Sequence, residues 1–134
     1  MEPFKITFPG NQRVDVAYKS FTMQTDQTAE NGGDETAPEP FELFLAGLGS
    51  CAGIYAKSFC DARDISTSGM QLVLDAAMEE GKTLLQGIKI VLYVNQEFPE
   101  KYIRAIIKTM DMCAVKNQLH PDIRVASSVA YLAG

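Results

Sequence analysis

The sequence predicts one α+β domain over residues 1–134, because strand-like and helix-like runs alternate along the chain. A length of 134 residues suits a single domain with its own core. Two stretches carry apolar residues at helical spacing. Runs typical of strands occupy residues 4–8, 14–25, 71–78, 84–93 and 123–131. The order strands, helix, strands, helix, strand favours two helices packed on one sheet.

The first predicted helix begins at Pro40 and is apolar on nearly all sides. Proline suits the first helical position, and Glu42 then lies in the first turn, where the helix dipole favours an anion. Three glycines follow in the helix, and each costs about 1 kcal/mol relative to alanine. They require a packing reason, such as close approach of a second copy of the helix. The apolar run between Glu42 and Lys57 is shorter than the roughly 20 residues that span a bilayer.

The segments around this helix carry clear turn and loop signals. Residues 9–11, Pro-Gly-Asn, predict a turn between the first two strands. Glycines and prolines predict a loop over residues 30–39, and residues 79–82 should join the third and fourth strand-like runs. Pro99 should open the second helix, whose apolar stripe places Cys113 on the core side near its end.

Charge and composition exclude several functions. The formal net charge is −5, and no lysine or arginine occurs from Phe21 to Ala56. Nucleic-acid binding needs a basic stripe, and an acidic surface disfavours anionic membranes. The three cysteines form neither a disulfide framework nor a CxxC motif, and His120 beside Pro121 is a surface-loop residue. With no signal peptide at the N-terminus, we expect a cytoplasmic protein in a reducing compartment, without metal or organic cofactor.

Cys51 and Cys113 are the residues most informative about function. A thiol on an apolar helix is usually a small hydrophobic residue, but two such thiols can also be a nucleophile and its resolving partner. Cys60 lies about 13 Å further along the first helix, too far for a disulfide with Cys51. Cys51 is also too deep in its helix for the dipole to activate it, so a guanidinium should reach it from another segment. Periodicity permits a Cys51–Cys113 pair and leaves the purely structural role open.

A resemblance to a known family favours the reactive role. The motif consists of Thr25-Asp26-Gln27, Gly32-Gly33 and the run Pro38-Glu39-Pro40-Phe41-Glu42-Leu43-Phe44-Leu45-Ala46-Gly47-Leu48-Gly49-Ser50-Cys51. It resembles the signature of the OsmC/Ohr family. The segment Cys113-Ala114-Val115-Lys116-Asn117-Gln118-Leu119 resembles the second-cysteine motif of the same family. The resemblance covers nearly the whole chain.

The resemblance implies a fold and an activity. The family fold is an α+β domain with an antiparallel-rich sheet and two central helices, assembled as an intertwined homodimer. The implied activity is the reduction of organic hydroperoxides during the oxidative stress response, with electrons from dithiols such as lipoyl proteins. Cys51 then corresponds to the peroxidatic cysteine and Cys113 to the resolving cysteine. Arg13 is the nearest match for the family's arginine, and Phe41, Phe44, Tyr55 and Met110 are candidates for the substrate pocket.

Two departures indicate a divergent branch of the family. In the best-characterised branch a glutamate that pairs with the arginine directly follows the proline matched by Pro40. This chain has Phe41 at that place and Glu42, the candidate replacement, one residue later. Ala114 stands where many members have proline. Two alternatives therefore remain beside the peroxidase: a non-enzymatic binder of a small apolar molecule, and a redox sensor that changes partners when Cys51 oxidises.

Overall fold

The computed structural model describes residues 1–78, 81 and 84–134. The chain forms two compact units, residues 1–44 and residues 45–134, and each is described by itself. The single domain predicted over residues 1–134 therefore stays a prediction. Among the described residues, the strands form two three-stranded sheets. The α+β class is confirmed, and residues of both helices pack with the sheet of the second unit, whereas the strands of the first unit form a separate sheet.

The first unit contains an antiparallel sheet of three short strands. Their order is β1-β2-β3, and the bounds are Lys5–Gly10 for β1, Arg13–Tyr18 for β2 and Phe21–Thr25 for β3. The single strand predicted over residues 14–25 is in fact two strands joined by a tight turn. Tyr18 pairs with Phe21, and Lys19 between them adopts a left-handed backbone with φ of 53°. The turn contains no glycine or asparagine, which would have marked it in the sequence. For this reason the alternating pattern predicted one continuous strand.

A buried carboxylate organises the loop that follows β3. Asp26 is 0% exposed, and its carboxylate accepts hydrogen bonds from the backbone N–H of Gln27 and from both the backbone N–H and the hydroxyl of Thr36. These donors, with the Thr36 hydroxyl the strongest, lower the pKa of Asp26 to about 2, although burial acts in the opposite direction. Gly33 lies against the backbone here, since a Cβ atom at that position would come within 2.1 Å of the Gln27 carbonyl oxygen. The loop is therefore a fixed structure, with a short 3-10 helix at Ala29–Asn31.

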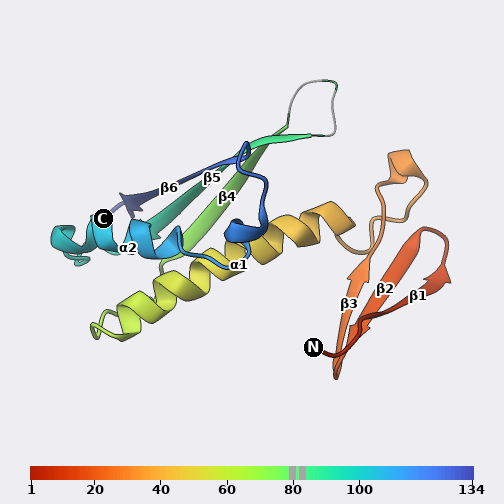
Figure 1. Cartoon of the computed structure of the whole chain (residues 1–134), viewed down its shortest axis with the longest axis horizontal. Coiled ribbons are helices and arrows are strands. Elements are labelled where there is room, and N and C mark those ends of the chain that lie inside the picture. The colour runs from red at the N-terminus through yellow and green to blue at the C-terminus, as the bar shows by residue number, and fades with distance from the viewer. Residues whose placement is uncertain (79–80, 82–83) are drawn as a thin grey trace. The chain divides into compact units, whose positions relative to one another are not determined.

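The second unit packs helices on one face of its sheet (Figure 1). The strand order is β4-β5-β6, with β4 antiparallel and β6 parallel to the central β5. The predicted connection at residues 79–82 lies largely outside the described residues. The bounds of the remaining elements are Pro40–Asp61 for α1, Gln71–Met78 for β4, Leu85–Val94 for β5, Glu100–Tyr102 for the 3-10 helix η2, Ile103–Met110 for α2, Lys116–Gln118 for the 3-10 helix η3 and Arg124–Tyr131 for β6.

The core of this unit lies between β5 and the helices. Alternate residues of β5 are buried, as expected for a strand with one face covered. They pack with buried residues of α1, α2 and the following turn, namely Leu48, Ala52, Ala56, Phe59, Cys60, Ile106, Met110 and Cys113. Pro40 begins α1 as predicted. This arrangement brings the last turn of α2 and the segment after it against the middle of α1.

Helix α1 extends beyond both ends of the uncharged run between Glu42 and Lys57. By length and composition alone its 22 residues are apolar enough to cross a membrane, a property also shown by core helices of soluble proteins. Only 28% of its most apolar window is buried inside the chain. Ile54 is 57% exposed, and a Cβ atom added at Gly47 or Gly53 would meet no described atom within 4 Å. The packing reason expected for these two glycines is thus not found within the described part of the chain.

The second helix is shorter than predicted. Pro99 precedes the 3-10 helix η2, and the regular helix α2 ends at Met110, so Cys113 lies in the turn after the helix. Asp111 explains this early end, because its carboxylate accepts a hydrogen bond from the Ser127 hydroxyl of β6 at 2.6 Å and pairs with the Lys116 ammonium at 3.1 Å. These contacts turn the chain back toward the sheet. Cys113 is nevertheless buried, as its place in the apolar stripe predicted.

Candidate active site

The structure brings Cys51 and Cys113 together. Cys51 lies in the middle of α1 and is half-buried, whereas Cys113 is 1% exposed in the turn after α2. The two thiols lie close enough that each shifts the pKa of the other. Both cysteines are free. The geometry that the spacing only permitted is therefore present within the second unit.

The surroundings of Cys51 favour its ionised form. Burial alone raises the pKa of a thiol, and it is the largest single influence on Cys51. The Cys113 thiol and the backbone N–H groups of Val115 and Ala114 together outweigh it, so that the pKa of Cys51 is lowered from its ordinary value. A lowered pKa gives more thiolate at neutral pH, and the thiolate is the nucleophilic form.

The pKa of Cys113 is shifted in the opposite direction. Burial raises the pKa of Cys113, and the hydrogen bond to Cys51 and the charge on that sulfur raise it further. The backbone N–H groups of Lys116 and Val115 oppose this shift only in part. Cys51 is thus the more acidic thiol of the pair, and Cys113 is the thiol that keeps its proton.

Arg13 and Glu42, the other predicted catalytic residues, have local partners in the first unit. Arg13 lies in β2, and its Nη2 contacts the carboxylate of Asp15 at 3.2 Å. Its Nε is buried without a hydrogen-bond partner among the described residues. Glu42 accepts a hydrogen bond from the backbone N–H of Glu39 at 2.9 Å, which is the reciprocal contact of a capping box at the start of α1. This cap gives Glu42 a structural task, and its catalytic role stays a prediction.

The predicted pocket residues occupy different environments. Phe41 and Phe44 are exposed and stack with ring centres 5.9 Å apart. Met110 is buried in the core. Tyr55, one turn beyond Cys51, borders an open hollow of about 410 Å³ with Ile54, Ser58, Phe59, Arg63 and Thr109. Of the four, Tyr55 thus borders a hollow formed by residues of the second unit.

Arg63, the arginine nearest to Cys51 in the sequence, lies just after the end of α1. Its guanidinium lies 3.6 Å from the ring centre of Phe59, and its Nη1 donates a hydrogen bond to the Phe59 carbonyl oxygen. It also lies over the ring of Tyr102. Arg63 thus has aromatic and backbone partners, and within the described residues of the second unit no arginine is among the groups that shift the pKa of Cys51.

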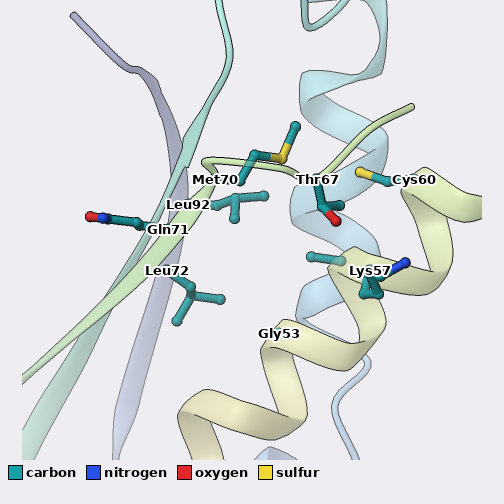
Figure 2. A pocket seen from close by; sticks show the side chains of 9 residues that line it. Gly53, Lys57, Cys60, Thr67, Met70, Gln71, Leu72 and Leu92 are labelled. Carbon is teal, nitrogen blue, oxygen red and sulfur yellow. The ribbon is translucent and has the colours of Figure 1, made fainter.

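The third cysteine lines a separate cavity of about 240 Å³. Cys60 is 0% exposed and faces Met70 and Leu92 across this space (Figure 2). Burial, with a smaller contribution from the carboxylate of Asp61, raises the pKa of Cys60, although Lys57 and Arg63 act in the opposite direction. Cys60 is therefore a neutral core thiol, apart from the Cys51–Cys113 pair.

Comparison with known proteins identifies the family. The model of the OsmC-like protein family matches residues 32–128, which include both cysteines of the pair. The chain belongs to the OsmC family. A comparison with curated proteins finds no significant match.

Solved structures of OsmC-like proteins share the fold. A Psychrobacter arcticus protein named for an osmotic stress induced and detoxification response is 23% identical with a TM-score of 0.85, covering 97% of this chain and 96% of that one. The organic hydroperoxide resistance protein OsmC of Legionella pneumophila is 17% identical with a TM-score of 0.65, covering 96% and 95%. An organic hydroperoxide resistance protein of Elizabethkingia anophelis is 16% identical with a TM-score of 0.67, covering 98% of both chains. At these identities the likeness establishes the fold.

Sequence reasoning missed the backbone donors at Ala114 and Val115 and the anchoring carboxylate of Asp111. Backbone N–H groups carry no residue-specific signal, because every residue except proline has one. The one sequence cue was Ala114 itself, since an alanine has the N–H that a proline lacks.

Proposed function

We propose that this protein reduces organic hydroperoxides with Cys51 as the peroxidatic and Cys113 as the resolving cysteine. The observation that supports this proposal is the contact between a thiol of lowered pKa and a second, proton-bearing thiol in one family-matched site. Two structural neighbours are named as organic hydroperoxide resistance proteins, which agrees with it.

The proposed reaction has three steps. The Cys51 thiolate attacks the terminal oxygen of ROOH, the O–O bond breaks, and the alkoxide leaves and takes a proton to give ROH, while Cys51 becomes a sulfenic acid. The Cys113 sulfur then attacks the Cys51 sulfur, which releases water and forms a disulfide. A dithiol reductant returns both cysteines to thiols and is itself oxidised to a disulfide. No metal or organic cofactor takes part in this scheme.

Other predicted residues keep their proposed roles around this pair. Arg13 is the proposed donor to the leaving alkoxide, with Glu42 as the carboxylate proposed to act with it. Tyr55 and the exposed rings of Phe41 and Phe44 provide apolar surface suited to the R group, and Met110 would support it from the core. The free thiols suit a reducing, cytoplasmic location, and the net charge of −5 gives no support to nucleic-acid or membrane partners.

The proposal includes a homodimer. Ile54 is exposed in the middle of α1, and open space surrounds Gly47 and Gly53. In the first unit, Phe8 and Phe21 are also largely exposed. A second copy of the chain would cover such surfaces, and an obligate interface typically buries more than about 2,000 Å². Light scattering at micromolar concentration tests this, and a stable monomer would contradict it.

The experiment for the activity measures peroxide consumption. The reduced protein should consume cumene hydroperoxide repeatedly when supplied with dihydrolipoamide, and mass spectrometry should detect a Cys51–Cys113 disulfide when the reductant is omitted. Unchanged thiol content after exposure to an excess of cumene hydroperoxide would contradict the proposal. One oxidation event without turnover with several dithiols would favour the redox sensor instead.

The cavity beside Cys60 favours a second candidate, the binding of a small apolar molecule. Its volume of about 240 Å³ and its apolar walls, which include Met70, Leu72 and Leu92, suit a small uncharged compound. This candidate predicts saturable binding of such compounds, with no loss of thiols when peroxide is added. The thiol measurement therefore separates the two functions.

A further inference from the structure

Asp111 occupies a place where helix chemistry disfavours an acid. It caps the C-terminal end of α2, where the unpaired carbonyl groups of the helix leave a negative partial charge. A cation such as Lys108 in the last turn is favoured there, whereas a carboxylate is disfavoured. The local sequence of the helix thus gives no reason for Asp111, so the reason lies in its contacts with other segments.

The Asp111 carboxylate joins two other segments through one of its oxygen atoms. Oδ1 accepts a hydrogen bond from the Ser127 hydroxyl of β6 at 2.6 Å and lies 3.1 Å from Nζ of Lys116. The first distance lies in the range of about 2.5–2.7 Å that is typical of a hydroxyl bonded to an ionised acceptor. The side chains of Asp111 and Lys116 are 37% and 26% exposed, so both contacts are partly shielded from water. Ser127 is in register with the buried Ile90 of the central strand β5, so the hydrogen bond ties Asp111 to the sheet beside the core.

Cys113 lies inside the loop that this ion pair closes. Its N–H donates a hydrogen bond to the carbonyl oxygen of Met110, and its carbonyl oxygen accepts one from the N–H of Asn117, both at 3.2 Å. The backbone of Cys113 is thus held from both sides. Residues 111–117, which form the Cys113 turn, are therefore tied to themselves and, through the carboxylate, to the sheet.

The Cys113 turn places its thiol against α1. Cys113 is 1% exposed and belongs to the buried cluster that contains Leu48 and Ala52 of α1. Cys51, which lies between these two residues in the helix, packs against the same cluster. A disulfide needs Cα atoms within about 7 Å and a narrow range of torsion angles. Bond formation between the two cysteines therefore depends on where the turn holds Cys113.

We propose that Asp111 is a positioning residue for the resolving step, because it fixes the Cys113 turn to β6 in the place from which Cys113 reaches Cys51. The role rests on the proposed peroxidase function. In this step the Cys113 sulfur attacks the sulfur of the Cys51 sulfenic acid, the S–S bond forms as the S–O bond breaks, and the hydroxyl leaves as water with the proton of the Cys113 thiol. The sulfenic acid is the oxidant of the thiol. Asp111 acts through the position of Cys113 and takes no part in the transfer of electrons or protons.

The test separates the resolving step from the attack on the peroxide. Stopped-flow mixing of the reduced protein with cumene hydroperoxide measures the attack, and quenching with dimedone at increasing times measures the decay of the Cys51 sulfenic acid. Asp111→Ala removes both contacts of the carboxylate. Ser127→Ala removes only the bond to β6, and Asp111→Asn keeps an acceptor for Ser127 but loses the charge that pairs with Lys116. Asp122→Ala is the matched control, since the Asp122 side chain is 91% exposed.

Asp111→Ala should slow the decay of the sulfenic acid about tenfold, because a displacement on the order of 1 Å from a productive geometry can cost up to roughly 100-fold in rate. The attack on the peroxide should slow much less. Ser127→Ala and Asp111→Asn should each slow the decay by a smaller factor, and Asp122→Ala should match the wild type in both steps.

A role of Asp111 in stability alone gives a different result. Asp111→Ala would then lower the melting temperature and leave the decay of the sulfenic acid unchanged in the folded protein, and this result would overturn the proposal. Where circular dichroism shows that Asp111→Ala does not fold, Asp111→Asn and Ser127→Ala decide by the same criterion, because each removes only one contact.

A second measurement distinguishes failure of this proposal from failure of the peroxidase function. In buffers of reduced and oxidised glutathione, the composition at which half of the chains carry the Cys51–Cys113 disulfide gives the effective concentration of one thiol at the other. Asp111→Ala should lower this concentration about tenfold. Such a decrease in a protein that consumes no cumene hydroperoxide supports the positioning role and overturns the peroxidase function. Consumption of the peroxide with the same effective concentration and decay rate in both proteins overturns the positioning role and leaves the function standing.

Discussion

Cys51 and Cys60 lie on the same helix, nine residues apart, and have opposite chemistry. Cys60 is completely buried beside an apolar cavity, and the pKa of its thiol is raised. Cys51 is only half-buried, and the pKa of its thiol is lowered. Lys57 and Arg63 lower the pKa of Cys60, but burial and the carboxylate of Asp61 raise it by more. At Cys51, three groups of the second unit, namely the Cys113 thiol and the backbone N–H groups of Val115 and Ala114, together prevail over burial.

The two thiols differ because groups of the turn after α2 lower the pKa of Cys51, whereas burial prevails at Cys60. A cation near a mobile surface is screened by water, whereas an N–H fixed in a turn stays directed at its acceptor. Position on the same helix is a poor guide. The neighbouring segment, here the turn after α2, distinguishes the two thiols.

The largest expected effect concerns peroxide consumption. Cys51→Ser should reduce it by about 1,000-fold or more, because the hydroxyl cannot replace the thiolate as nucleophile. Cys60→Ala should leave the turnover number within about twofold, since a neutral core thiol takes no part in the proposed reaction. Steady-state assays with cumene hydroperoxide on both variants, at equal helicity, make the comparison. Equal losses in the two variants would show that the thiols are wrongly assigned.

The next effect separates the two roles of Cys113. Cys113→Ser retains a proton donor for Cys51 but cannot resolve the sulfenic acid, so each chain should lose one thiol, bind dimedone and then stall. The wild type should lose two thiols per peroxide molecule reduced. Cys113→Ala should in addition slow the first attack at pH 6, because it removes a donor that lowers the pKa of Cys51. Thiol titration and stopped-flow measurements check both results, and two thiols lost in Cys113→Ser would exclude Cys113 as the resolving residue.

Asp26 extends the comparison to a carboxylate. It is as buried as Cys60, but donors lower its pKa to about 2. Because the folded-state pKa lies below the unfolded value of about 3.9, Asp26 adds stability above pH 4 that is lost as the pH falls toward 2. Asp26→Asn should lower the melting temperature at pH 7 and flatten its decline between pH 4 and pH 2. Differential scanning calorimetry at several pH values measures this, with Asp34→Asn as the exposed control.

The smallest expected effect compares two faces of α1. A Cβ atom at Gly49 would lie 3.5 Å from the Leu74 side chain, an ordinary contact. Gly49→Ala should therefore stabilise the protein by about 0.5–1 kcal/mol through helix propensity. Gly47→Ala gains the same propensity but should weaken the proposed dimer if that open position faces the second copy. Denaturant midpoints at two protein concentrations distinguish the variants, and a destabilising Gly49→Ala would show that this face has no room.

Local chemistry made part of this structure predictable. Pro40 marks the start of α1 because proline removes an N–H that a helix start does not use. The apolar stripe of the second helix predicted the burial of Ile106, Met110 and Cys113. Glycines and prolines located the loop after β3, although nothing in the pattern revealed that Asp26 organises it.

The rest depended on contacts between distant segments. The early end of α2 follows from the bonds of Asp111 to Ser127 and Lys116, and the pattern of apolar residues continues past it. The turn at Lys19 uses a left-handed backbone at a residue without a turn preference. The activation of Cys51 was expected from an arginine, because side chains can be counted in a sequence whereas unpaired backbone N–H groups cannot. Whether Arg13 takes part stays a prediction.

The acidic character of the segment before Cys51 has a practical consequence for following its oxidation. Since no lysine or arginine occurs between Lys19 and Lys57, trypsin releases Cys51 within the single peptide of residues 20–57. Cys60 is released in residues 58–63 and Cys113 in residues 109–116. Each thiol therefore has its own tryptic peptide. A bond between the two neighbouring sulfurs would join the first peptide to the third, and one digest would report the redox state of all three.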